Sequence, residues 1–179
     1  RTMLIDIHSH LDHHYFKDGL DKVIENARKA GVKIILTAGI SPETNRKALE
    51  LAGKYDIVKP CLGIYPVQYE NDNNTENNIK NYDSDTIIKT NKTKTIEKNN
   101  NLNIKSGNNA KNNKNKINID EELKFIENNK NKIAAVGEVG LDYLSIESNV
   151  KKQKEQFEKI IQLTEKLNKP IIIHSRKAE

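Results

Sequence analysis

The chain has 179 residues, of which 35% are hydrophobic and 5% aromatic, and its formal net charge is +5 at pH 7. This length allows one domain with a buried core, and the shortage of apolar residues indicates that part of the chain is not packed. The single cysteine, Cys61, excludes an intramolecular disulfide framework and a thiolate zinc cluster, and we expect it to be buried and inert.

No apolar run approaches the length of a transmembrane helix. The sequence also lacks the apolar segment followed by a small-residue cleavage site that is typical of a secretory signal. These features predict a protein of the cytoplasm, or of the nucleus, with no membrane partner. Because the chain opens Arg1-Thr2-Met3, the sequence leaves open whether natural N-terminal residues, and a signal among them, are missing.

The first apolar run, Met3 to Ile7, leads into two histidines within the sequence IDIHSHLD. In an extended strand alternate side chains point to the same face, so His8 and His10 are expected to point the same way. Two neutral imidazoles at one strand end can bind a divalent metal ion. For this motif alone, the alternative is a partly exposed His-Ser-His in a loop.

Helices and strands are then predicted to alternate. The spacing of apolar residues predicts a helix over 19–30, capped by Asp18, and Ser41-Pro42-Glu43 predicts the start of a second helix. Mostly apolar runs predict strands at 32–38 and 57–63. Later elements are a short helix capped by Asp120, a strand at 133–136, a long helix, and a strand at 171–173. The long helix is expected to face the core with Val150, Phe157, Ile160, Ile161, Thr164 and Leu167.

This alternation predicts an α/β fold with a parallel sheet and right-handed crossovers. A doubly wound sheet and a (β/α)8 barrel of the TIM type both satisfy it. No G-x-G-x-x-G fingerprint follows the first strand, which argues against a dinucleotide-binding sheet. We therefore favour the barrel, in which functional residues gather at the carboxyl ends of the strands.

An Asn- and Lys-rich segment over 71–119 interrupts this pattern, and it predicts a disordered, low-complexity insertion. The predicted organisation is therefore 1–70 with strands one to three, the insertion, and 120–179 with strands four and five. The insertion holds nine lysines and five acidic residues, so the rest of the chain, with 21 basic and 20 acidic residues, is nearly neutral. Its lysines could tether DNA electrostatically, and a tolerated solvated loop is the alternative.

Two further apolar runs end in potential metal ligands, Glu138 in GEVGLD and His174 in IIIHSR. Together with His8 and His10 they are expected to meet at one rim, where nitrogen and oxygen ligands suit zinc, manganese, cobalt or magnesium. Glu138 could bridge two ions, with His8 and His10 on one ion and His174 on the other. Paired ions of this kind catalyse hydrolysis. Taken singly, a solvated carboxylate and a lone histidine are the alternatives.

The strings DIHSHLD, KPCLGIYP, GEVGLDY and PIIIHSRKAE, in this order, resemble the TatD family of metal-dependent deoxyribonucleases. The resemblance covers nearly all of the chain outside the insertion. It implies a barrel of eight strands and eight helices, two divalent metal ions and DNA as the substrate. It also implies that His8 and His10 bind the first metal, that Glu138 bridges both and is catalytic, and that His174 binds the second.

Two residues are assigned to substrate binding. Arg176 could hold a substrate phosphate through its guanidinium fork, and a surface arginine is the alternative. Tyr65 stands where the family usually has a histidine in a G-x-H-P string, and a phenol is a poor metal ligand that can donate one hydrogen bond. Asp12 and Asp142 belong to the family strings but receive no catalytic role.

The resemblance calls for a further metal-binding histidine and aspartate beyond Glu179, and a barrel of this type needs ~250 residues. We therefore expect about the first five strands of the barrel, as a fragment or truncated product of the enzyme. Two alternatives remain. One is another amidohydrolase-like hydrolase, although such relatives typically bridge their metals with a modified lysine where this chain has Glu138. The other is a catalytically inactive truncated product. The sequence does not predict the oligomeric state.

Overall fold

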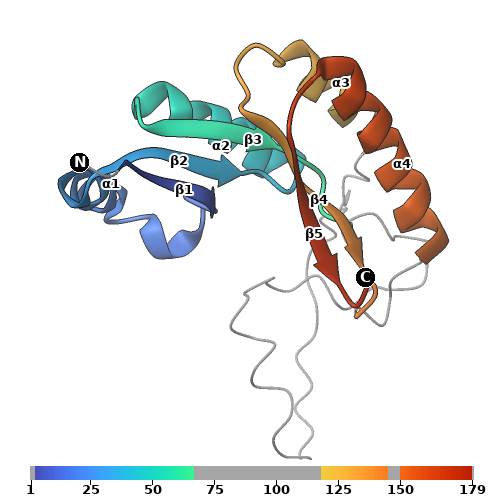
Figure 1. Ribbon diagram of the computed structural model, residues 1–179, viewed down its shortest axis with the longest axis horizontal. Helices are drawn as coiled ribbons and strands as arrows, with labels where there is room; N and C mark the ends of the chain where they lie inside the picture. Colours follow the sequence, from blue (N-terminus) through green and yellow to red (C-terminus); the bar gives the residue numbers. More distant parts are fainter. Residues whose placement is uncertain (1–2, 67–117, 145–149, 179) are drawn as a thin grey trace, which may run out of the picture. The chain divides into compact units, whose positions relative to one another are not determined.

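The fold is described by a computed structural model that covers residues 3–66, 118–144 and 150–178. These residues form five parallel strands in one sheet, hydrogen-bonded in the order β1-β2-β3-β4-β5 (Figure 1). The strands are β1 (Leu4–Ser9), β2 (Val32–Ala38), β3 (Val58–Leu62), β4 (Ala135–Asp142) and β5 (Ile171–Arg176). The helices are η1 (His14–Phe16), α1 (Leu20–Ala30), α2 (Pro42–Lys54), α3 (Ile119–Asn128) and α4 (Val150–Leu167). The α/β class is confirmed, with strands in chain order as in the first half of a β/α barrel.

The predicted insertion over 71–119 lies, except for its last two residues, outside the described part of the chain. All the described elements belong to one unit, formed by 1–70 and 117–179. Within the described ranges, no helix is long and apolar enough to cross a membrane.

Strand β4 is longer than the predicted strand at 133–136, because its two glycines do not end it. Gly137 and Gly140 both have positive φ, of 153° and 145°. A Cβ atom on Gly140 would collide with the carbonyl oxygen of His174 on β5, so glycine allows the two strands to approach closely here. Strand β5 is also longer than predicted and includes both His174 and Arg176.

The helix caps agree with the sequence only in part. Ser41 caps α2 as predicted, with a reciprocal capping box through Thr44. For α1 the prediction of Asp18 was wrong, because the N-cap is Gly19, with no side-chain cap bond. For α3 the cap is Asn118 and not Asp120, since the Asn118 side chain accepts the first free N–H groups.

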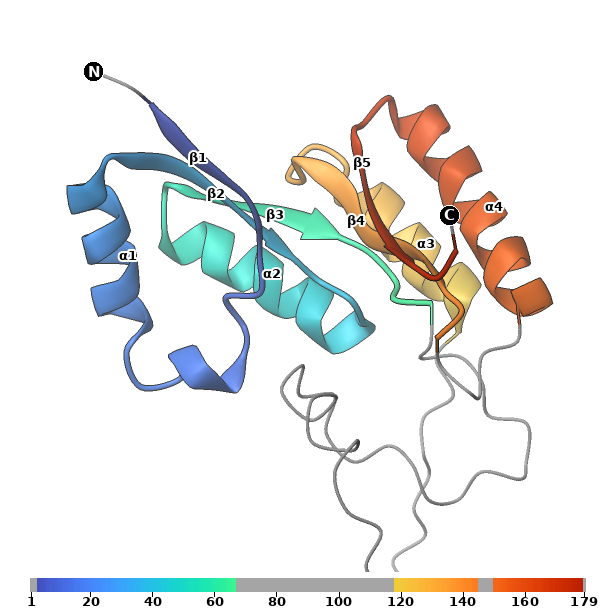
Figure 2. The same cartoon turned by 60° about the horizontal axis from the view of Figure 1, so that its bottom comes forward.

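The core consists of two clusters that share the sheet. Figure 2 shows the helices that take part in them, with α1 and α2 beside β2 and β3, and α3 and α4 beside β4. One cluster joins α1 and α2 to β2 and the start of β3, and the other joins α2, α3 and α4 to the end of β3 and to β4. The most deeply buried side chains of the two clusters include Ile24, Val58, Leu62, Ile64, Ile126, Val136, Val139 and Ile160. Cys61 is also buried, as predicted, and burial raises the pKa of its thiol to about 11.

The buried face of α4 differs from the predicted stripe. Val150 and Ile161 are exposed, whereas Gln153 and Gln156 are buried with Ile160, Leu163 and Thr164. Apolar periodicity could not identify this face, because its first turns carry amide side chains. Gln153 meets the cost of burial by hydrogen bonding to the main chain of β4.

Strands β1 and β5 are the two edges of the described sheet. Large apolar side chains on them are exposed, with relative accessibilities of 70% for Ile7 and 56% for Ile173. Exposed apolar edge strands are a template for pairing with another strand.

Candidate metal centre

His8 and His10 lie at the carboxyl end of β1 and face the same carboxylate. His8 Nε2 lies 3.4 Å and His10 Nε2 3.2 Å from Glu138 Oε2. One ligand atom from each of the three residues can be chosen so that all lie within 4.8 Å of one another. The sequence prediction that both imidazoles point the same way is therefore confirmed.

The ring of His10 is held in one orientation by β2. Its Nδ1 lies 2.9 Å from the carbonyl oxygen of Ala38, and the N–H of the next residue, Leu11, is bonded to Thr37 Oγ1 at 3.1 Å. A carbonyl oxygen only accepts hydrogen bonds, so Nδ1 of His10 carries a proton. In the neutral ring, Nε2 therefore presents its lone pair to Glu138, as is typical of metal-binding histidines.

Glu138 lies in the middle of β4, and not at the end of a strand as predicted. Its main-chain N–H bonds to the carbonyl oxygen of Gly39 at 3.1 Å. A Cβ atom on Gly63 would collide with the main chain of Glu138, so the absence of a side chain there lets the segment after β3 approach β4. Only 12% of the Glu138 side chain is exposed.

His174 faces the second oxygen of the same carboxylate. It is paired with Gly140 in the sheet, and its Nδ1 lies 2.9 Å from Glu138 Oε1. The two oxygens of Glu138 are thus directed to different histidines, Oε2 to those of β1 and Oε1 to that of β5. The four predicted ligands lie together, but the compact group of ligand atoms includes only His8, His10 and Glu138.

The charges of this cluster depend on one another. Burial would raise the pKa of Glu138, but hydrogen bonds with His10 and His174 outweigh it and lower the pKa to about 2. The hydrogen bond to Glu138 in turn raises the pKa of His10 and of His174 against the opposing effect of burial. A buried carboxylate that needs positive charge on both of its oxygens fits a divalent cation, and the nitrogen and oxygen ligands fit zinc, manganese, cobalt or magnesium.

Asp142 is the centre of a second group of contacts, which the sequence analysis did not predict. The carboxylate is fully buried and accepts hydrogen bonds from Tyr65 Oη at 2.9 Å and from Arg176 Nε at 2.9 Å. Arg176 Nη2 lies 2.7 Å from its other oxygen, and His174 Nε2 lies 3.4 Å from it. The only signal in the sequence was the position of Asp142 in the string GEVGLDY.

The electrostatics of this second group keep Asp142 ionised and Tyr65 protonated. Burial would raise the pKa of Asp142, but the hydrogen bonds from Arg176 and Tyr65 lower it below its usual value. Burial and the neighbouring Asp142 raise the pKa of Tyr65, so its phenol retains its proton. Arg176, predicted to hold a substrate phosphate, has its guanidinium oriented by Asp142.

The hollow beside the cluster has a volume of about 550 Å³. His8, Glu138 and His174 line it together with apolar side chains of β1, β2, β4 and β5, among them Ile7 and Ile173. The cluster therefore borders a concave, partly apolar surface that is large enough for a small ligand.

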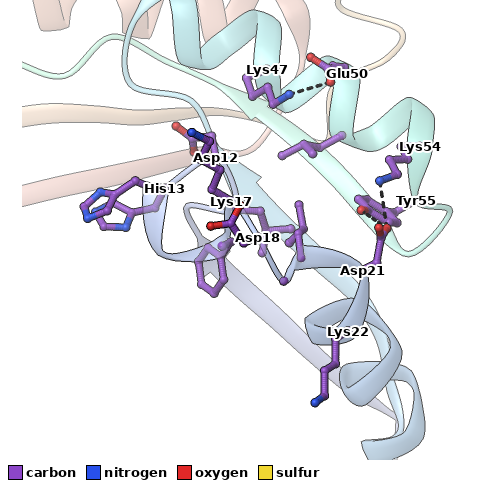
Figure 3. A pocket seen from close by; sticks show the side chains of 16 residues that line it. Asp12, His13, Lys17, Asp18, Asp21, Lys22, Lys47, Glu50, Lys54 and Tyr55 are labelled. Carbon is purple, nitrogen blue, oxygen red and sulfur yellow. Dashed lines mark hydrogen bonds and ion pairs between the residues drawn. The ribbon is translucent and has the colours of Figure 1, made fainter.

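A second hollow, of about 670 Å³, is lined by the segment after β1, by the start of α1 and by the C-terminal part of α2 (Figure 3). Two of its lysines are paired with acids, Lys47 with Glu50 and Lys54 with Asp21, which also accepts a bond from Tyr55. Asp12, which belongs to a family string, lines this hollow, and burial raises its pKa. Lys47 and Lys54 are thus neutralised within the hollow, and we assign no ligand to it.

Comparison with known proteins gives a family match and a set of relatives. The family model described as TatD related DNase matches residues 5–179. An uncharacterized metal-dependent hydrolase from Methanocaldococcus jannaschii is 33% identical over 172 residues, which cover 96% of this chain and 50% of the relative. Deoxyribonuclease TATDN3 from Homo sapiens is 29% identical over 180 residues, covering 98% and 53%.

Solved structures show the same fold. The crystal structure of a TatD homolog from Escherichia coli K12 aligns with a TM-score of 0.64 and 21% identity, covering 97% of this chain and 51% of that chain. A TatD family hydrolase from Entamoeba histolytica aligns with a TM-score of 0.64 and 20% identity, covering 99% and 51%. The chain therefore spans about half the length of the relatives it matches.

Proposed function

The chain belongs to the TatD-related DNase family, and from this membership and the geometry of the cluster we propose that it forms part of a divalent-metal-dependent hydrolase of DNA phosphodiester bonds. One observation carries the proposal. Three potential ligand atoms, from the neighbouring His8 and His10 and from Glu138 far along the sequence, lie within 4.8 Å of one another. A relative named deoxyribonuclease supports DNA as the substrate.

In the proposed site His8 and His10 would hold one ion and His174 a second, and Glu138 would be a ligand of both. The separate directions of Oε1 and Oε2 support this division. When bound, such ions lower the pKa of a water molecule and neutralise charge on a phosphate. Zinc, manganese, magnesium and cobalt all suit this set of ligands.

The remaining residues act on the substrate and on the histidines. We propose that Arg176, oriented by Asp142, directs its planar guanidinium to a phosphate of the DNA. Tyr65, within 2.9 Å of His174, lies close enough to contact the same substrate. The apolar side chains of the 550 Å³ hollow limit the access of water from that side.

The proposed organisation places an insertion over 71–119 between the parts 1–70 and 120–179. The pairing of β3 with β4, Cys61 with Ala135 and Leu62 with Val136, supports one sheet across it. Its lysines are proposed to act as a solvated loop and not as a DNA tether. Replacing 71–117 with a short linker tests this, because a loop gives unchanged DNA affinity and salt dependence, whereas a tether gives weaker binding with a smaller salt slope.

The experiment that tests the function combines metal binding with cleavage. The chain is titrated with Mn²⁺ and Zn²⁺ and incubated with end-labelled DNA, as the parent and as Glu138→Gln. Glu25→Gln, on the exposed surface of α1, is the matched control. We expect metal-dependent cleavage by the parent and the control, and loss of both binding and cleavage in Glu138→Gln.

Two other outcomes would contradict the proposal. The Methanocaldococcus relative carries no named substrate, so a panel of amides and lactones is included in the assay. Hydrolysis of these compounds without DNA cleavage would assign the chain to another type of metal hydrolase. Metal binding without turnover of any substrate would identify a catalytically inactive chain.

A further inference from the structure

His174 has an oxygen partner at each ring nitrogen. Its Nδ1 lies 2.9 Å from Glu138 Oε1, and its Nε2 lies 2.9 Å from Tyr65 Oη. The position of the ring protons, and hence the atom that can bind a metal, depends on what these partners can accept.

The position of the phenol proton of Tyr65 determines which atom donates in the contact between Tyr65 Oη and His174 Nε2. Tyr65 Oη lies 2.9 Å from Asp142 Oδ2, and because an ionised carboxylate only accepts, the single O–H of Tyr65 is donated to Asp142. Toward His174 the phenol oxygen is then an acceptor. Nε2 of His174 must therefore carry a proton, and it also faces Asp142 Oδ2 at 3.4 Å.

With its proton on Nε2, the neutral ring of His174 presents the lone pair of Nδ1 to Glu138 Oε1. A lone pair and a carboxylate oxygen at 2.9 Å repel each other unless positive charge lies between them. Nδ1 is thus the position at which a bound proton can be exchanged for a metal ion. We propose that Tyr65 and Asp142 are positioning residues that fix the Nε2–H tautomer of His174 and so reserve Nδ1 as a metal ligand.

The surroundings of Asp142 hold this arrangement rigidly. Gln153 is buried and bonds both main-chain groups of Asp142, accepting from its N–H at 2.8 Å and donating to its C=O at 2.9 Å. Arg176 engages both carboxylate oxygens of Asp142, which fixes the rotation of the carboxylate. The fixed Asp142 carboxylate holds the O–H of Tyr65, and the phenol oxygen then accepts from Nε2 of His174.

The proposal rests on the proposed metal site, and its first test needs no metal and no activity. Imidazole ¹⁵N NMR of the metal-free, ¹⁵N-histidine-labelled chain distinguishes the two tautomers of a neutral ring, and His174→Gln assigns the signals. We expect Nε2 of His174 to carry a proton in the metal-free parent, either in the imidazolium or in the Nε2–H tautomer of the neutral ring. Tyr65→Phe should admit the Nδ1–H tautomer. Tyr55→Phe, which also removes a tyrosine-to-aspartate hydrogen bond but lies outside the site, should leave the His174 signals unchanged.

The second test is metal affinity by calorimetry with Mn²⁺ and Zn²⁺. Loss of a group that orients a metal-binding histidine typically weakens binding about 10- to 100-fold. In Tyr65→Phe we expect the affinity for one of the two ions to fall by this factor and the affinity for the other to stay unchanged. In the Tyr55→Phe control we expect both affinities to equal those of the parent.

Several results would overturn the inference. They are an Nδ1–H tautomer in the parent, a single bound ion, or Tyr65→Phe with parental tautomer and affinities. If Tyr65→Phe does not fold, the parent spectrum and stoichiometry still decide. A parent that shows the expected tautomer and binds two ions but cleaves no DNA would support this inference while contradicting the proposed function.

Discussion

The side-chain amide of Asn45 donates a hydrogen bond to the Glu122 carboxylate at 2.8 Å, although 77 residues separate them in the sequence. Asn45 also donates to the carbonyl oxygen of Gly63 at 2.9 Å and accepts from its N–H at 3.0 Å. Arg46, the next residue, pairs with the same Glu122. Helix α2 thus connects the segment after β3 to α3. The predicted insertion lies between these two parts of the sequence.

Replacing Asn45 with alanine should therefore destabilise the whole sheet. Asn45 is fully buried, and its loss leaves the polar groups of Gly63 and Glu122 short of a partner, at a cost of about 1–3 kcal/mol for each. We expect the free energy of unfolding to fall by about 3 kcal/mol in a urea titration. Asn26→Ala, at an exposed position of α1, is the control and should change it by less than about 0.5 kcal/mol. A small effect of Asn45→Ala would show that this connection is not needed.

The charges of the metal centre predict two opposite pH dependences. The pKa values of His10 and His174 are raised from 6.5 by Glu138, so the protonated rings stabilise the metal-free chain below pH 6.5. This stabilisation is lost as the pH rises through the raised values, and Mn²⁺ affinity should increase over the same range because the protons leave. Calorimetry and thermal unfolding at several pH values check both slopes. Parallel slopes would contradict the expectation.

At acidic pH the same cluster should lose stability for a different reason. The pKa of Glu138 is lowered from 4.5 to about 2, so its contribution to stability is present above pH 4.5 and is lost as the pH falls toward 2. Glu138→Gln should flatten this part of the stability profile, as measured by thermal unfolding between pH 2 and pH 5. An unchanged profile would assign the acid sensitivity to other carboxylates.

Because β4 and β5 approach each other closely, Gly140→Ala should lower the stability of the chain. Gly140 has φ of 145°, and its Cβ atom would collide with the carbonyl oxygen of His174. We expect a loss of about 2–4 kcal/mol and weaker metal binding, because β5 carries His174. Gly53→Ala is the matched control, since Gly53 lies in α2 with open space around it, and it should stabilise the chain by about 0.5–1 kcal/mol. Equal effects of the two substitutions would contradict the close approach.

The sequence was sufficient to predict the backbone plan and the residues of the cluster. Runs of apolar residues marked the strands, and parallel strands bring their carboxyl ends to one edge, so His8, His10, Glu138 and His174 were expected to lie together. They do, although Glu138 lies in the middle of β4 and not at its end. The length of β4 was missed because glycines usually mark turns, whereas Gly137 and Gly140 serve here to admit β5.

Buried polar residues could not be predicted in the same way. Gln153 and Asp142 gave no periodic signal, because a polar side chain is buried only when partners distant in the sequence satisfy it. The partner of Gln153 is the main chain of β4, and the partners of Asp142 are the side chains of Tyr65 and Arg176. These contacts exist only in the assembled sheet. The residues that orient the site were therefore missed, while its potential ligands were found. The roles assigned to those ligands stay predictions.

The exposed edge of β1 predicts self-association of the chain. β1 is an edge strand of the described sheet, and Ile7 on it is 70% exposed and lines the hollow beside the cluster, so an apolar edge is open to a second strand. A lysine at position 7 should block such pairing by charge repulsion and desolvation, so Ile7→Lys is expected to shift the chain toward monomer in light scattering across a concentration series. Ile161→Lys, on the exposed side of α4 and away from the edges, is the control and should associate like the parent. His8 and Glu138 also line this hollow. If self-association does not reach the metal centre, Ile7→Lys should leave the Mn²⁺ affinity unchanged.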